Sequence, residues 1–156
     1  MQLLGAVPDT DNLNADITRG EFVDMLYNFY NPGKSNIELA YTDVTEDSPW
    51  ANAVKWALEA GVIRGITDKT FAPDKKITRL EMIVMLARFD EERENPLTAT
   101  EPEYHLADCN NIPSWGKNAV HWAVANRIIY GNNGSILPDD YVKVSEAIAM
   151  ISRCAK

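Results

Sequence analysis

Two short segments place an arginine where helix chemistry does not favour one. ITRGE (17–21) and ITRLE (77–81) each carry a threonine three residues before a glutamate, and an apolar run follows. This spacing predicts a capping box, in which the threonine hydroxyl and the glutamate carboxylate accept from each other's backbone amides. Arg19 and Arg79 then occupy the first helical position, where the helix dipole is already positive. Their repeated use predicts a role beyond helix stability.

The chemistry open to these arginines is the recognition of an anion. A guanidinium is a planar fork that matches a carboxylate with two hydrogen bonds, and amides at a helix start favour negative charge. We therefore interpret each helix start as a small anion trap. A ligand carboxylate would fit it, and so would a structural carboxylate from a loop that flanks a predicted helix, namely Asp16, Asp43, Asp74 or Asp108.

Motifs for catalysis or metal binding are not found in the sequence. His105 and His121 have no serine or cysteine nucleophile at motif spacing, and there is no Walker box, H-E-x-x-H motif or dinucleotide fingerprint. Cys109 and Cys154 cannot form a metal site alone, so we interpret them as free thiols, with a disulfide as the alternative in an oxidising compartment. We expect no enzyme activity, no cofactor and no metal.

The boxes belong to a repeat that covers most of the 156 residues. Residues 41–65 align with 105–131, and residues 71–88 align with 136–153, at separations of 65 or 66. A half copy, residues 16–29, lies 60 residues before its counterpart. Self-similarity of this kind is typical of repeat architectures.

Each full unit is predicted to be a helix, a loop and a second helix. The first helix is expected to begin near residues 48–50 or 113–115, because serine and an early proline suit a helix start. Phe71 and Ile136 are expected to be apolar plugs that hold the loop down. The second helix should bury one face, formed by Met82, Met85, Leu86 and Phe89, or by Ala147, Met150 and Ile151.

These units predict one domain with three parts. Residues 1–40 form a partial unit with only the second helix, residues 41–98 form a full unit, and residues 99–156 form a full unit with a degenerate box. The polar segment 91–103 is interpreted as a linker. Amphipathic helices of this length need neighbouring units to bury their apolar stripes.

Composition excludes several classes of partner. The net charge of −8 argues against nucleic acid, because phosphate binding needs a basic face. No apolar run approaches the roughly 20 residues that span a membrane. The segment QLLGAVPD after Met1 has neither a basic nor an apolar region, so no signal peptide is expected there.

The residue order of a full unit resembles the S-layer homology (SLH) domain. The matching positions are Asp43, Trp50, Ala57, Gly61, Gly65, Phe71, Pro73 and the box at 77–81. The resemblance implies an all-α fold, a pseudo-threefold prism of helix-loop-helix SLH repeats, here with the first repeat incomplete. It also implies a non-catalytic, extracellular module that anchors a protein to the bacterial cell wall. The implied ligand is an anionic, pyruvylated secondary cell-wall polysaccharide held in grooves between repeats.

Because of this resemblance, we predict that Arg19 and Arg79 bind the carboxylate of the polysaccharide. In the last unit the box reads VKVSE (142–146), so the capping threonine and the arginine are both absent. We expect the capping box there to be lost, and we expect the groove at Val144 not to bind the ligand. The loop glycines Gly65 and Gly131 either let the backbone approach a sugar or merely permit positive φ.

The four tryptophans allow two interpretations. Sugars stack on exposed rings, whereas a tryptophan on an apolar helix stripe is usually core. We predict that Trp50 and Trp115 pack internally, and that Trp56 or Trp122 lines a groove.

The alternative function is a protein–protein or self-assembly module of a surface layer. Its grooves would be degenerate, and its partners would be other surface-layer proteins or a second copy of the chain.

Overall fold

The computed structural model describes residues 12–93, 106–130 and 134–155, and the described chain is helical. The elements are α1 (Arg19–Tyr30), α2 (Ala51–Glu59), α3 (Arg79–Glu91), a short 3-10 helix (Cys109–Asn111), α4 (Ser114–Ala125) and α5 (Val144–Cys154). Extended segments in the described ranges pair only as isolated bridges. The predicted all-α repeat fold is confirmed.

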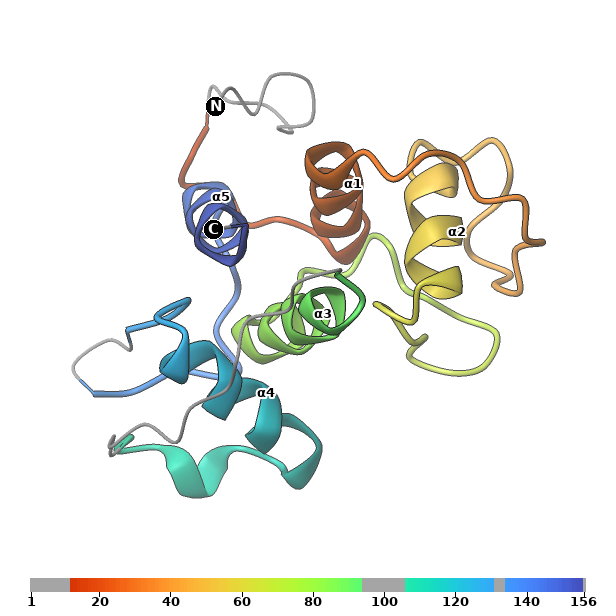
Figure 1. The fold of residues 1–156 in the computed structure, drawn as a ribbon. Coiled ribbons are helices and arrows are strands. Elements are labelled where there is room, and N and C mark those ends of the chain that lie inside the picture. Colours follow the sequence, from red (N-terminus) through yellow and green to blue (C-terminus); the bar gives the residue numbers. More distant parts are fainter. Residues whose placement is uncertain (1–11, 94–105, 131–133, 156) are drawn as a thin grey trace.

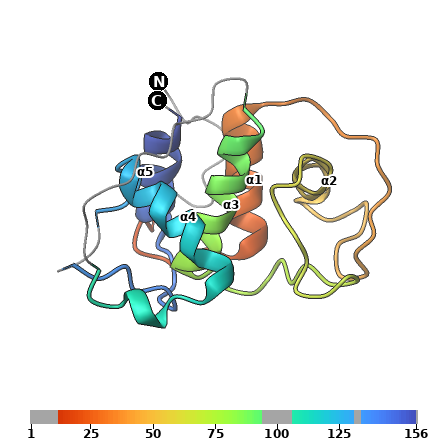
Figure 2. The same cartoon turned by 60° about the horizontal axis from the view of Figure 1, so that its bottom comes forward.

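The second helices of the three units form the centre of the molecule. α1, α3 and α5 lie around a common axis, with α2 packed on α1 and α4 packed on α3 (Figures 1 and 2). Each outer helix thus packs on the central helix of the preceding unit. The predicted linker begins too early, because α3 continues to Glu91, and residues 94–103 of it lie outside the described ranges.

A closed ring of backbone hydrogen bonds joins the three units at this axis. The amide of Ile17 donates to the carbonyl of Val142 (3.0 Å), Val142 donates to Ile77 (3.2 Å), and Ile77 donates to Ile17 (3.1 Å). All three side chains are fully buried. Because each residue both donates and accepts, no unit can leave without exposing buried backbone groups.

The helix starts extend this ring outward. Arg19 and Gly20 of α1 donate their amides to the carbonyls of Lys75 (2.8 Å) and Pro73 (2.9 Å) in the next unit. The first two amides of α3 bind residues 138–140, and those of α5 bind residues 13–15, in the same way. Since these amides are already used, the predicted contribution of helix-start amides to an anion trap is wrong.

The two capping boxes predicted from the sequence form in the structure. Thr18 with Glu21, and Thr78 with Glu81, form complete capping boxes. Lys143 caps α5 without any side-chain hydrogen bond, so the predicted loss of the box in the last unit is confirmed.

The loops between helices are fixed by buried plugs, as predicted. Phe71 and Ile136 are fully buried. The carboxylate of Asp43 accepts from the amides of Phe71 (2.9 Å) and Ala72 (2.7 Å), and Asp108 holds the equivalent loop of the last unit. Asp43 and Asp108 therefore secure loop backbone and do not bind the box arginines.

An aspartate and two lysines, instead of an arginine and a glutamate, connect the last unit to the first. Asp16 accepts from Lys143 and from Lys76 (3.0 Å), so one carboxylate joins all three units near the axis. The hydrogen bond from Lys143, and then that from Lys76, lowers the pKa of Asp16 below its ordinary value of 3.8.

This depressed pKa predicts acid sensitivity. The charged form is favoured in the folded state, so its stabilisation is present above pH 3.8 and is lost as the pH falls through the lower folded pKa. Asp16→Asn should be less stable than wild type in urea at pH 6, and the gap should close below pH 3.8. Asp47→Asn, at an exposed aspartate, is the matched control. A gap independent of pH would contradict this assignment.

Candidate functional site

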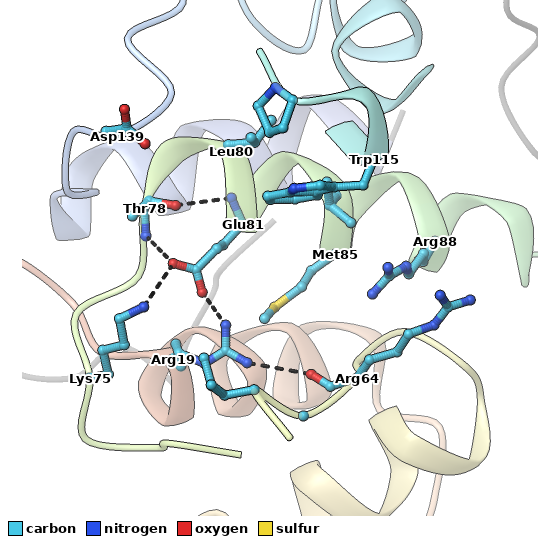
Figure 3. A pocket seen from close by; sticks show the side chains of 14 residues that line it. Arg19, Arg64, Lys75, Thr78, Leu80, Glu81, Met85, Arg88, Trp115 and Asp139 are labelled. Atoms are coloured by element: carbon cyan, nitrogen blue, oxygen red, sulfur yellow. Dashed lines mark hydrogen bonds and ion pairs between the residues drawn. The ribbon is translucent and has the colours of Figure 1, made fainter. Parts of the chain in front are cut away.

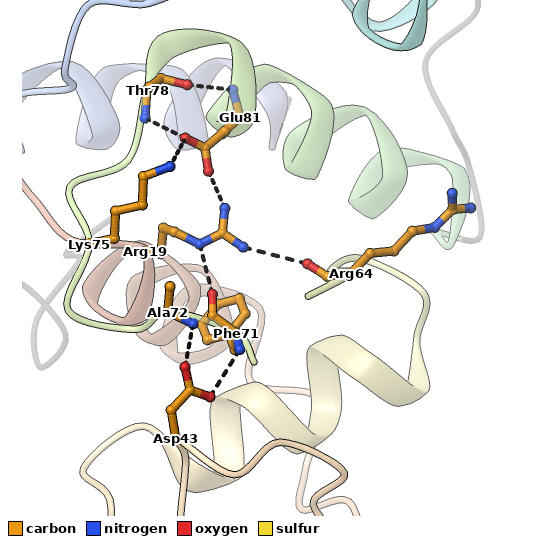
Figure 4. Close-up of polar contacts among 8 residues, drawn as sticks. All are labelled: Arg19, Asp43, Arg64, Phe71, Ala72, Lys75, Thr78 and Glu81. Atoms are coloured by element: carbon orange, nitrogen blue, oxygen red, sulfur yellow. Dashed lines mark hydrogen bonds and ion pairs between the residues drawn. The ribbon is translucent and has the colours of Figure 1, made fainter. Parts of the chain in front are cut away.

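Arg19 lies at the base of the site and is almost completely enclosed. Its exposed fraction is 4%, and its guanidinium pairs with Glu81 of the next capping box. Nε donates to the carbonyl of Phe71 (3.0 Å), Nη2 lies 3.5 Å from the carbonyl of Arg64, and the guanidinium stacks over the Phe71 ring (Figure 4). Arg19 thus connects the first unit to the loop and the box of the second.

Arg79 repeats this arrangement one unit later. Its Nε donates to the carbonyl of Ile136 (2.7 Å), and its Nη1 pairs with Glu146 (3.0 Å). The arginine of each box therefore binds the glutamate of the following box. Val144 cannot make this contact to Glu21, so the arrangement is not repeated at the third interface.

A groove of about 550 Å³ opens beside the Arg19–Glu81 pair (Figure 3). It runs between α3, the loop after α2 and the start of α4. Its lining combines charged and apolar side chains: Arg19, Arg64, Gly65, Ile66, Lys75, Thr78, Leu80, Glu81, Val84, Met85, Arg88, Pro113, Trp115 and Asp139. Four cationic side chains face two carboxylates, which leaves an excess of two positive charges in an acidic chain.

Among the described residues, Arg64 and Arg88 are the two cationic side chains of this groove that lie outside the ion pairs of Glu81. Glu81 is bound by Arg19 and lies 3.7 Å from Lys75, so two cations of the floor share its single negative charge. Burial, and then the charge of Arg64, lowers the pKa of Arg88, and the charge of Glu91 opposes this shift. The guanidinium groups of Arg64 and Arg88 lie on the same side of the groove in Figure 3. Neither arginine belongs to a motif, and the sequence analysis did not identify them.

Trp115 contradicts the prediction that it packs internally, because its exposed fraction is 61%. Gly20 leaves room on α1 for the ring of Trp50, which would lie 2.9 Å from a Cβ at that position. The equivalent position on α3 is Leu80, which fills that space and packs against Gly116 instead. The Trp115 ring consequently lies over the groove.

The two tryptophans predicted to line a groove are largely buried. Trp56 and Trp122 have exposed fractions of 7% and 8%, although an edge of each reaches a cavity wall. Trp122 donates its indole N–H to Asp90 (3.0 Å). Gly65 lines the groove, and carbonyl oxygens of the same loop would clash with any side chain there. Gly131 lies outside the described residues.

The groove continues along α3 toward its C-terminal end. A second cavity of about 910 Å³ shares Arg64, Val84, Arg88 and Trp115 with the first. It extends to Trp122 and the end of α3. Arg64 and Arg88 thus lie where the two cavities meet, and Asp90, Glu91 and Glu92 line the far part of the second one.

Other chemistry is absent from the described part of the chain. Its histidine, cysteine and acidic side chains form no cluster able to hold a metal ion, and the two cysteines are free. No helix there has the length and apolar character needed to cross a membrane.

Comparison with known families gives one result. A sequence model of the S-layer homology domain matches residues 40–83 and 106–148, which together make up more than half of the chain.

Similar proteins include an anchoring protein, an enzyme and a surface-layer protein. The chain is 30% identical to a cellulosome-anchoring protein of Acetivibrio thermocellus, over 88% of this chain and 32% of that protein. It is 29% identical to an endoglucanase of Bacillus sp. strain KSM-635, over 83% of this chain and 14% of the enzyme. It is 28% identical to a surface-layer 125 kDa protein of Lysinibacillus sphaericus, over 63% of this chain and 8% of that protein. The chain thus spans less than a third of the length of these relatives.

The two arginine–glutamate pairs predict different losses of stability. Arg19→Leu should lower the free energy of unfolding by roughly 3 kcal/mol, because it leaves a partly buried Glu81 with only the exposed Lys75 at 3.7 Å. Arg79→Leu should cost about 1 kcal/mol, since Glu146 is 37% exposed and water screens it. Urea denaturation at neutral pH measures both. Equal losses, or a larger loss for Arg79→Leu, would show that the burial argument is incorrect.

Proposed function

Because the chain belongs to the S-layer homology domain family, we propose that it binds an anionic secondary cell-wall polysaccharide whose acidic group is a pyruvyl carboxylate. This family places the chain at the bacterial cell surface or cell wall, and its general role is cell-surface anchoring. The proposed binding is reversible and involves no chemical step, so we further propose that this chain is not itself an enzyme.

The observation that carries the proposal is the facing pair of like charges in the groove. Burial, and then repulsion from Arg64, lowers the pKa of Arg88, while the charge of Glu91 opposes this shift. An anion between the two arginines would remove their mutual repulsion. The last unit offers a comparison, because Arg153, the counterpart of Arg88, stacks on the ring of Tyr130 (4.9 Å). Tyr130 is the counterpart of Arg64. In the last unit, Arg153 therefore has an aromatic partner within the chain. In the second unit, we propose that the partner of Arg88 is the ligand.

The remaining walls suit a sugar attached to that acid. Trp115 presents an exposed ring above the apolar side chains of α3, and a saccharide can stack its C–H face on such a surface. Gly65 contributes backbone to the opposite wall, because the carbonyls of Thr67 and Thr70 leave no room for a side chain there. A planar guanidinium matches a carboxylate with two hydrogen bonds, which suits Arg64 and Arg88 to a pyruvyl group.

Arg19 keeps the proposed ligand role in a modified form, whereas for Arg79, which pairs with Glu146, that role stays a prediction. Arg19 lines the floor of the groove, where its ion pair with Glu81 sets the position of both the floor and the loop that carries Arg64. A ligand carboxylate above it would meet the guanidinium edge while Glu81 stays bound. For Trp56, Trp122 and Gly131 the ligand role stays a prediction without support from the geometry.

Charge reversal at the two groove arginines tests this proposal. The Arg64→Glu/Arg88→Glu double variant should lose at least tenfold in affinity for pyruvylated wall polymer, because the ligand carboxylate then meets two like charges. Trp115→Ala should weaken binding less, through lost stacking. Polymer pull-down, with and without enzymatic removal of the pyruvyl group, measures both effects.

A matched control changes the same net charge elsewhere. The Lys34→Glu/Lys69→Glu double variant alters two exposed lysines outside the groove and should bind as wild type does. Unchanged binding by the arginine variant would refute the groove. A concentration-dependent oligomer with no affinity for the polymer would instead favour the self-assembly alternative.

A further inference from the structure

We propose that a separate pocket, at the C-terminal ends of α1, α2 and α3, binds an organic cation through its ammonium group. This pocket encloses about 270 Å³. It lies at the opposite end of α1 and α3 from the capping boxes, and it shares only Glu92 with the extended groove. Its volume is below that of typical drug-sized sites, so it suits a head group or a single side chain. The lining residues are Tyr30, Pro32, Trp56, Ala60, Phe89, Glu92 and Arg93.

Three aromatic rings form the apolar wall of the pocket. The ring centroids of Tyr30 and Trp56 are 6.0 Å apart, those of Tyr30 and Phe89 are 5.1 Å apart, and those of Trp56 and Phe89 are 6.2 Å apart. Aromatic faces carry negative potential and attract ammonium groups. The cation–aromatic contacts in the described ranges use other rings, so these three have no internal cation.

Three helix ends direct further negative potential to the same place. Tyr30 is the last residue of α1, Ala60 is the C-cap of α2, and Glu92 is the C-cap of α3. The C-terminal end of a helix carries partial negative charge, which favours a cation. α1 and α2 have no basic residue in their last turns to offset it.

Charged side chains at the pocket leave this preference intact. Glu92 is exposed and adds a full negative charge. Arg93 also lines the pocket, but its guanidinium donates to the carbonyl of Cys154 and lies 3.4 Å from Asp90. Because Asp90 offsets the charge of Arg93, the uncompensated charge at the pocket is that of Glu92.

These features together select an ammonium ligand over other classes. Among the described residues, Glu92 is the one carboxylate that lines the pocket, which is too few for a metal site, and a neutral sugar has no charge to be attracted by the helix ends. A quaternary ammonium and the primary ammonium of an amino sugar share the chemistry that the pocket recognises. Both present a positive charge next to an apolar body.

Titration calorimetry of the whole 156-residue chain with tetramethylammonium tests the proposal. The neutral isostere 3,3-dimethyl-1-butanol is the reference ligand, because it has the same apolar shape without the charge. We expect tetramethylammonium to bind roughly tenfold more tightly. Choline and glucosamine then identify the source of the ammonium by their relative affinities, with N-acetylglucosamine as the neutral control for the sugar.

Two variants and one matched control locate the binding. Glu92→Gln and Tyr30→Leu should each weaken tetramethylammonium binding several-fold, and both positions are exposed enough to leave the fold intact. Glu91→Gln removes the neighbouring charge, which does not line this pocket, and should have no effect. Circular dichroism confirms folding of all three.

The proposal is overturned if the neutral isostere binds as tightly as tetramethylammonium, or if Glu92→Gln behaves like Glu91→Gln. Polymer pull-down with Tyr30→Leu separates the two sites. Retained polymer binding together with lost ammonium binding supports an independent pocket.

Discussion

The ring of backbone hydrogen bonds among Ile17, Ile77 and Val142 is the constraint on which the structure depends. Residues separated by 60 and 65 positions share one buried junction, and each satisfies one neighbour's carbonyl and receives another neighbour's amide. An unpaired buried backbone group costs about 1–3 kcal/mol. The three central helices begin directly after these residues, so the ring fixes where every box starts.

The box arginines use this placement. A cation at a helix start is locally unfavourable, but Arg19 and Arg79 reach the glutamate of the next box and a loop carbonyl beside it. Contacts across the units thus offset a small local cost. The Arg19–Glu81 ion pair has no net charge, so the positive excess of the groove comes from Lys75, Arg64 and Arg88.

Local signals in the sequence predicted the boxes, the plugs and the lost cap at Lys143, because these depend on residues close together in the chain. The partners of the arginines depend on which unit lies next to which in space. The repeat spacing of 60 to 65 residues does not show that order. The exposure of Trp115 was missed for a related reason, since it depends on Leu80 replacing the glycine found at residue 20. Arg64 and Arg88 lie 24 positions apart without a motif, and only the fold brings them to one groove.

Native-state hydrogen exchange of the three ring amides tests the central claim most directly. If the ring joins all units into one cooperative structure, the amides of Ile17, Ile77 and Val142 should exchange only through global unfolding and share one protection free energy. Much faster exchange at Ile17 than at Ile77 would show that the first unit opens separately, and it would contradict the account.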